Sequence, residues 1–173
     1  MIKEILEERK VPDLLCGADS AEKWEARRKE IFEILETEIY GRPIPKMQTV
    51  GQHLDEELIC AQAGIRTSVR LFFPALPEFS FPVEIMRPRY VKNPPVIVFL
   101  NFRPDVYDRY LPCEEILDNG FAVARIWYSD IVSDDGDFNN GLAKALKVDR
   151  TDPTAPGKLA MWAWAASRTL DYL

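Results

Sequence analysis

Side chains able to carry out nucleophilic catalysis are scarce in this sequence of 173 residues. Acyl transfer through serine needs a serine on a tight strand-to-helix turn, a histidine base and a carboxylate that orients the base. The sequence contains no G-x-S-x-G or G-x-S-R motif, and its one histidine, His53, lies in a stretch that alternates polar and apolar residues. We interpret His53 as a strand residue that faces solvent or a neighbouring side chain. No catalytic residue is therefore predicted within this chain.

Polar and aromatic side chains follow two apolar stretches, where a pocket wall is expected. Asn101, Phe102 and Arg103 come directly after residues 96–100, and Tyr128 and Asp130 come after residues 121–127. Because ligands bind at the carboxyl ends of strands in open α/β sheets, we predict that these five residues line a substrate pocket. For Asn101, Phe102 and Arg103, a loop with a purely structural role is an equal alternative. For Asp130, we favour a structural role in which the carboxylate accepts backbone N–H groups and braces a loop. Arg103 is followed by proline with no glycine nearby, which argues against a backbone oxyanion hole there.

An acidic segment after Tyr128 contains Asp134, Asp135 and Asp137, which could suggest a calcium loop. Such a loop needs alternating oxygen ligands closed by a bidentate glutamate, and no glutamate follows. A solvated loop is therefore favoured, and no metal ion or cofactor is predicted.

Charge and cysteine usage limit the partners and the compartment. A formal net charge of −6 disfavours nucleic acid and anionic membrane surfaces. The longest apolar run, residues 96–100, is too short to cross a bilayer, and the charged N-terminus does not resemble a signal peptide. Cys16, Cys60 and Cys113 are an odd set without C-x-x-C spacing, which favours buried reduced thiols over a disulfide or a metal site. Together these features predict a cytoplasmic protein.

Residues 1–45 form a predicted N-terminal helical segment. Asp19, with Glu22 three residues later, is typical of a helix start, and Gly41 is typical of a helix end. Between them an amphipathic stripe is expected to face the core. Its members are Trp24, Arg27, Ile31, Ile34, Leu35 and Ile39.

Residues 46–173 carry the signals of a sheet flanked by helices. Alternation over residues 47–54, 57–63 and 65–73, with a turn at Gly64, and a further strand over 81–86 predict an antiparallel meander. Residues 96–100 and 121–127 are almost wholly apolar, which is typical of parallel strands covered on both faces. A helix over 110–119, ended by Gly120, would connect them as a βαβ unit with a right-handed crossover.

A short helix over 139–146 and a long final helix are predicted to complete the chain. The apolar face of the final helix is predicted to comprise Leu159, Trp162, Ala163, Ala166, Leu170 and Leu173. Trp162 is expected in the core, Trp164 either under a loop or exposed, and Arg168 is expected to pair with Asp171. A parallel sheet of so few strands is unusual as a complete structure. We therefore expect a single α/β domain that is incomplete, because the final helix should lead into another buried strand.

Four groups of residues, in this order, resemble a known family. They are Trp24, Arg27-Arg28, Glu30-Ile31 and Tyr40-Gly41; residues 95–102; residues 120–124 with 128–131; and residues 159–164 with 167–173. The set is similar to the N-terminal half of the glucuronoyl esterase and acetyl xylan esterase-like branch of the α/β hydrolases. The resemblance implies an antiparallel meander leading into a parallel sheet, and a G-x-S-R-x-G-K nucleophile elbow, an acid and a histidine beyond the residues present here.

The resemblance implies a scaffold half of a serine esterase for acetyl or glucuronoyl esters of carbohydrates, inactive alone. Its expected partner is a complementary C-terminal half, or a second copy, bound through an exposed sheet edge and the final helix with Trp162, Trp164, Leu170 and Leu173. The alternative is a non-catalytic binding module on a partial hydrolase scaffold. A small independent α/β enzyme has less support, since no phosphate-binding glycine loop is present.

Overall fold

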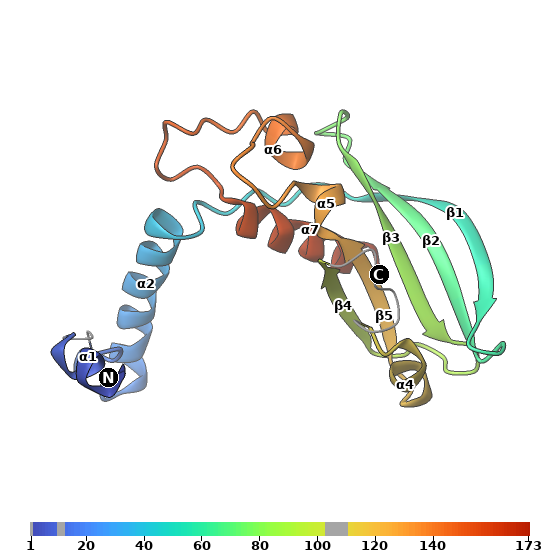
Figure 1. The fold of residues 1–173 in the computed structure, drawn as a ribbon, viewed down its shortest axis with the longest axis horizontal. Helices are drawn as coiled ribbons and strands as arrows, with labels where there is room; N and C mark the ends of the chain where they lie inside the picture. Colours follow the sequence, from blue (N-terminus) through green and yellow to red (C-terminus); the bar gives the residue numbers. More distant parts are fainter. Residues whose placement is uncertain (1, 10–12, 103–110) are drawn as a thin grey trace.

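A five-stranded mixed sheet with helices on both faces forms the body of the protein (Figure 1). The computed structural model describes residues 2–9, 13–102 and 111–173. Two helices, α1 (Ile2–Glu8) and α2 (Ala21–Glu38), precede the sheet, and α2 extends away from it. No helix in the described ranges has the length and apolar character needed to cross a bilayer.

The sheet has the strand order β1-β2-β3-β5-β4. Strands β1 (Val50–Ile59), β2 (Gly64–Phe72) and β3 (Ser80–Pro88) pair antiparallel, and β3 pairs antiparallel with β5 (Ala122–Trp127). Strand β4 (Val96–Asn101) pairs parallel with β5, and α4 (Cys113–Asp118) lies between them in the sequence. The predicted meander followed by a βαβ unit is confirmed.

The boundaries of the first strands differ from the prediction. Residues 47–54 and 57–63 do not form two strands, because β1 continues through a register irregularity between His53 and Asp55. Such a bulge inserts an extra residue without ending the ladder. Gly64 begins β2 instead of forming the turn. The turn is made by residues 60–63, where Cys60, Ala61 and Gln62 have positive φ values that usually favour glycine, so no residue type in this segment indicates the turn.

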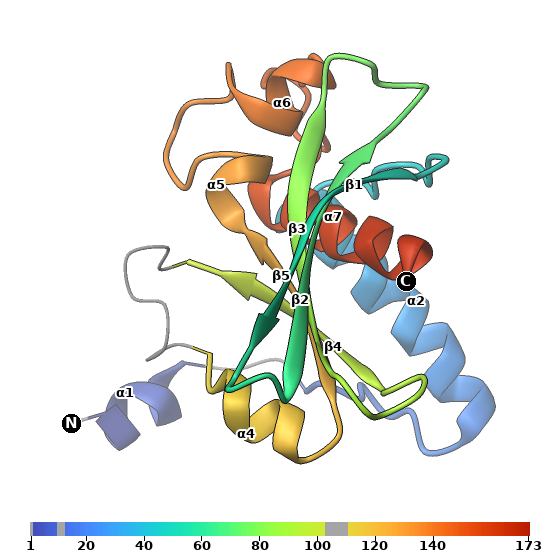
Figure 2. The same ribbon diagram turned by 90° about the vertical axis from the view of Figure 1, so that its right-hand side faces the viewer.

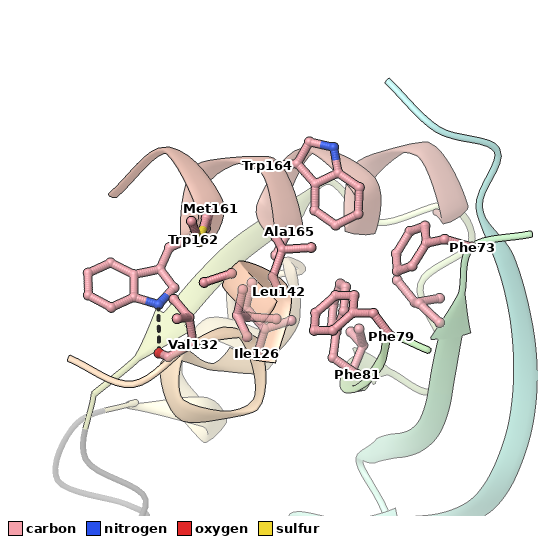
Figure 3. Close-up of a cluster of buried hydrophobic side chains, with 14 of the residues drawn as sticks. Phe73, Phe79, Phe81, Ile126, Val132, Leu142, Met161, Trp162, Trp164 and Ala165 are labelled. Carbon is pink, nitrogen blue, oxygen red and sulfur yellow. Dashed lines mark hydrogen bonds between the residues drawn. The ribbon is translucent and has the colours of Figure 1, made fainter. Parts of the chain in front are cut away.

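The larger core lies between one face of the sheet and α7 (Lys158–Tyr172), with α5 (Tyr128–Ile131) and α6 (Gly141–Ala145) at its end (Figure 3). Aromatic rings dominate it. The ring centroid of Trp164 lies 4.8 Å from that of Phe73, which also stacks on Phe79 and Phe81. Both tryptophans satisfy their indole N–H groups, since Trp162 Nε1 donates to Val132 O at 3.2 Å and Trp164 Nε1 to Pro45 O at 3.0 Å.

The smaller core packs α4 on the opposite face of the sheet against Met86 and Val123. Gly120 ends this helix with φ +80°, and the amide of Phe121 donates to Ile116 O at 3.1 Å. The predicted role of Gly120 is confirmed, because only glycine adopts this conformation at little cost. The helix itself is shorter than 110–119, and Tyr110 lies outside the described residues.

The N-terminal helix corrects two predictions. Its N-cap is Ser20, whose hydroxyl accepts from the Lys23 amide at 3.3 Å, whereas Asp19 binds the Lys23 ammonium at 2.7 Å. None of the described α2 side chains is buried, and Ile34 and Ile39 are 51% and 59% exposed. The apolar stripe exists but does not face the core, because α2 runs outward from the sheet (Figure 1) and lies behind α7 in the view of Figure 2.

The apolar stripe of the final helix is only partly buried, and β4 is exposed at the edge of the sheet that was expected to be open. The core face of α7 carries Met161, Trp162, Trp164 and Ala165, while Leu159, Leu170 and Leu173 are exposed. Strand β4 was predicted to be covered on both faces, yet Val96 and Ile97 are 37% and 42% exposed. The reason is its position, since β4 forms the edge of the sheet in the described part of the chain.

Candidate functional site

The carboxyl ends of β4 and β5 lie side by side, as the pocket prediction requires. The parallel register pairs Asn101 with Trp127, so Phe102 and Tyr128 leave the sheet together. Asn101 is fully buried at the end of β4, whereas Phe102 is 38% exposed. Arg103, the third predicted residue of this loop, lies outside the described residues.

Phe102 and Tyr128 form an aromatic surface with Trp162. Their ring centroids are 4.7 Å apart with planes inclined by 8°, and the Trp162 ring meets Phe102 edge-on at 5.1 Å. The hydrogen bond from Trp162 to Val132 O fixes the indole, which in turn supports the stacked pair. A rigid stacked pair with one exposed ring offers an apolar face to a sugar ring or an acyl group.

Asp130 lies apart from this aromatic surface. It lines a cavity of about 460 Å³ on the sheet, together with Glu84, Arg125 and Trp127. Burial raises the pKa of the Asp130 carboxyl, and the charge of Arg70 opposes this effect. Asp130 was predicted to line one pocket wall together with Tyr128, whereas it lines a cavity that Tyr128 does not reach.

A buried ion pair lines the same cavity and was missed from the sequence. Arg125 on β5 is 1% exposed and sits directly opposite Glu84 on β3. Its Nε donates to Glu84 Oε2 at 2.7 Å, its Nη2 contacts the same oxygen, and its guanidinium lies 4.6 Å from the centre of the Trp127 ring. The available signal was a single arginine within an otherwise apolar strand, because a charge there needs a partner on the neighbouring strand.

A second cavity, of about 610 Å³, lies between the end of α2 and α7 and is lined mainly by apolar side chains. Arg168 on its wall is only 6% exposed, and its Nη2 binds Asp171 Oδ2 at 2.8 Å. Among the described residues, its Nε and Nη1 have no hydrogen-bond partner. The predicted pair with Asp171 is present, but it is largely buried on its arginine side instead of exposed.

The acidic segment is a hydrogen-bonded surface loop. Asp135 accepts from the Ser133 hydroxyl at 2.7 Å and from the Lys158 ammonium at 2.9 Å. These bonds, with that from the amide of Asp137, lower the pKa of Asp135 to about 2. Within the described ranges no group of three or more histidine, cysteine, aspartate or glutamate side chains could hold a metal ion.

The one histidine lies far from the candidate pocket. His53 is exposed on β1, at the edge of the sheet opposite β4. It therefore cannot act as a base for chemistry at the ends of β4 and β5. The predicted solvent-facing strand position is confirmed.

The fold is similar to that of solved glucuronoyl esterases. A CE15 glucuronoyl esterase from Teredinibacter turnerae T7901 matches 94% of this chain with a TM-score of 0.73 and 25% identity. The chain has part of an α/β-hydrolase fold. A promiscuous CE15 esterase from a marine bacterial metagenome matches with a TM-score of 0.68 and 24% identity, and a CE15 glucuronoyl esterase from Caldicellulosiruptor kristjansonii with 0.63 and 17%.

This α/β-hydrolase portion spans only about half of the esterases that it matches. It covers 46%, 52% and 40% of the three chains. No protein-family model and no curated protein matches the sequence. The resemblance to part of a glucuronoyl esterase is thus confirmed at the level of the structure.

Proposed function

We propose that this chain is the scaffold half of a serine carboxylic-ester hydrolase that acts on acetyl or glucuronoyl esters of carbohydrates. Its nucleophile, acid and histidine would come from a complementary polypeptide. The observation that carries the proposal is the sheet, which resembles that of a hydrolase and whose parallel part ends at the apolar edge strand β4 in the described residues. The chain also covers only about half the length of the esterases with a similar structure. An enzyme that binds carbohydrate esters accounts for both the fold and the aromatic surface at the strand ends.

The open edge of β4 supports this assignment. Edge strands normally carry charges or lie under a loop, whereas β4 presents Val96 and Ile97. Helix α7 lies against β4, so a strand that follows α7 by a right-handed crossover would pair parallel to β4. In α/β hydrolases a strand-to-helix turn carries the nucleophilic serine. A serine at the end of the added strand would lie next to Phe102 and Tyr128.

Arg168 and α2 support a covering polypeptide. Buried N–H groups without acceptors cost about 1–3 kcal/mol or more, so Arg168 Nε and Nη1 favour an acceptor supplied from outside the described residues. Phe32 and Leu35 of α2 line the same cavity, and Phe32 is 46% exposed. We propose that the complementary half covers this cavity as well as the β4 edge. Trp162 and Trp164, which were expected to contribute to that interface, are already buried in the core, whereas Leu170 and Leu173 remain exposed.

The pocket assignment follows from the same arrangement. We assign Phe102 and Tyr128 to one wall of the substrate pocket, with Arg103 as a further member on sequence grounds alone. Asn101 would support the strand end from its buried position. Asp130 would face the cavity that holds Arg125, so its contribution would be structural.

The nucleotide sequence that follows the codon for Leu173 provides the first test. A reading frame that encodes a G-x-S-R-x-G-K motif after one further apolar strand would support the proposal. The second test is hydrolysis of a 4-nitrophenyl acetate and of a methyl glucuronoyl ester by this chain, by the downstream polypeptide and by the two together. Activity only in the combined sample is expected, and it should disappear when the motif serine is replaced by alanine.

Two other outcomes would favour different proposals. If neither the separate nor the combined polypeptides hydrolyse esters, but the chain binds a xylan oligosaccharide, the non-catalytic binding module is correct. A stable homodimer that is disrupted by Ile97→Lys would indicate that the β4 edge pairs with a second copy. The cytoplasmic location stays a prediction, and fractionation of the source cells would test it.

A further inference from the structure

We propose that Cys60 and Cys113 are a redox-sensitive thiol pair, which a peroxide closes into a disulfide between the β1–β2 turn and α4. The proposal is independent of the proposed esterase function. It concerns a part of the molecule on the far side of the sheet from α7, where the smaller core lies.

The fold brings these two cysteines together from distant parts of the sequence. Cys60 directly follows β1, and Cys113 is the first residue of α4. Both thiols are half-buried, both pack against the smaller core, and both line one cavity of about 520 Å³. The Cys113 thiol donates to Met86 Sδ at 3.4 Å, and Cys60 is close enough to be among the groups that raise the pKa of the Cys113 thiol.

The backbone around the pair is held closely. A Cβ atom added to Gly64, at the start of β2, would lie 2.7 Å from Leu117 Cδ1, so the hairpin presses directly on α4. The turn is closed by a hydrogen bond from the Ala63 amide to Cys60 O at 2.9 Å. A disulfide needs the Cα atoms of its two cysteines about 4.4–6.8 Å apart, and the packing of the hairpin on α4 is what would bring Cys60 and Cys113 to such a separation.

The third cysteine provides an internal comparison. Cys16 is exposed, and its thiol donates to Asp13 O at 2.9 Å within a surface turn. It neither lines the cavity nor belongs to the smaller core. The sequence prediction of buried thiols is therefore wrong for Cys16, and only Cys60 and Cys113 are placed to react with each other.

The chemistry needs an oxidant, which we assign to the peroxide class. Burial, followed by the nearby Cys60, raises the pKa of the Cys113 thiol to about 12, so this thiol is neutral near pH 7. We assign the first attack on hydrogen peroxide to Cys60, whose thiol gives up its proton as the O–O bond breaks, forming a sulfenic acid and releasing one water. Cys113 then loses its proton and attacks the Cys60 sulfur, releasing the second water. Two thiols and one peroxide become one disulfide and two waters.

The cross-link would stabilise the fold by restricting the unfolded chain. It would close a loop that contains β2, β3 and β4. A disulfide that closes a loop of this size is expected to raise the melting temperature by roughly 5–10 °C. Because the second step requires loss of the Cys113 proton, closure should become faster as the pH rises from 7 to 9.

The test uses the full chain carrying Cys16→Ser, treated with hydrogen peroxide and then alkylated under denaturing conditions. We expect an intact mass lower by two hydrogen atoms, a linked Cys60–Cys113 peptide in a non-reducing digest, and reversal by dithiothreitol. The melting temperature should rise with oxidation and fall on reduction. Cys60→Ala and Cys113→Ala in the same background should show neither the mass loss nor the temperature shift.

Three results would overturn the proposal. They are sulfinic or sulfonic acid at either cysteine without a link, full alkylation of both thiols after peroxide treatment, and a link that forms only between two chains. The intact mass and the search for a linked peptide are measured on a chain that keeps both Cys60 and Cys113. These two measurements therefore do not depend on whether the alanine variants fold. Loss or gain of esterase activity has no bearing on these outcomes.

Discussion

The buried ion pair between Arg125 and Glu84 should make the two partners unequal in their contribution to stability. The Arg125 side chain is 0% exposed, whereas that of Glu84 is 22% exposed and also lies 3.9 Å from an Arg66 nitrogen. Removing the carboxylate by Glu84→Ala takes away the acceptor of the Arg125 Nε hydrogen bond while the guanidinium stays inside the sheet, over the Trp127 ring. Loss of one partner of a buried pair typically costs 3–5 kcal/mol, and we expect about 3 kcal/mol here because Glu84 is partly solvated.

The reverse truncation should cost less. Arg125→Met removes the buried charge and keeps most of the side-chain volume, while the remaining carboxylate retains solvent and Arg66. We expect a loss of about 1 kcal/mol, and a similar loss for the double variant Glu84→Ala with Arg125→Met, which gives a coupling energy of about 3 kcal/mol in magnitude. By contrast, Glu57→Ala removes an Arg66 partner that is 49% exposed, and it should cost less than about 1 kcal/mol.

Urea unfolding followed by far-ultraviolet circular dichroism would measure these free energies of unfolding. Glu84→Ala should lower the melting temperature by roughly 6–12 °C, which is well resolved. The reasoning fails if Arg125→Met is as damaging as Glu84→Ala, because the arginine would then act through its packing. It also fails if Glu84→Ala is no worse than Glu57→Ala.

Three further changes test the backbone, a surface carboxylate and the larger core. Gly41→Ala should lower the melting temperature by more than Gly17→Ala, which is expected to cost about 1 kcal/mol of the free energy of unfolding. Both glycines have positive φ, but of the two only Gly41 would bring an added Cβ atom into overlap with neighbouring backbone. The Ser133 hydroxyl is the largest cause that lowers the pKa of Asp135 to about 2 in the folded protein. The ionised carboxylate therefore stabilises the fold fully above the pKa of Asp135 in the unfolded chain, and this stabilisation is lost as the pH falls towards 2. Asp135→Asn should flatten the acid limb of a curve of stability against pH. Trp164→Ala should cost about 3–5 kcal/mol in urea unfolding, because Trp164 is 5% exposed, packs against the rings of Phe73 and Phe79, and donates its indole N–H to Pro45 O.

The parts of the fold that the sequence predicts are those set by local periodicity. Residues 96–100 are wholly apolar and residues 121–127 are apolar except for Arg125, and Gly120 ends the helix between them, so the βαβ unit follows from short-range signals. The resulting parallel register also explains why the paired strand ends were found, since Asn101 and Trp127 must then be neighbours. The irregularity at His53 was missed because a bulge changes the register without changing the composition.

The features that the sequence did not predict depend on contacts between distant residues. Cys60 and Cys113 meet because a hairpin turn presses on a crossover helix, and nothing in their spacing indicates this contact. Asp130 and Tyr128 are neighbours in sequence but face different surroundings, because α5 begins between the strand end and the acidic loop. Side-chain direction at the end of a strand is set by such a turn, which has no simple pattern of its own.

Helix α7 is apolar on more than the one face that the sequence predicted. Of the predicted stripe, Trp162 is buried whereas Leu159 and Leu170 are exposed, and Met161 and Ala165, which lie outside the stripe, also pack in the core. A helix that is apolar on both faces is typical of one enclosed between two layers. The exposed face borders the cavity that Arg168 lines. The buried Nε and Nη1 atoms of Arg168 have no acceptor among the described residues. Both observations on one helix favour a second protein layer over α7, on the side next to the open edge of β4, which is where the proposed complementary half would bind.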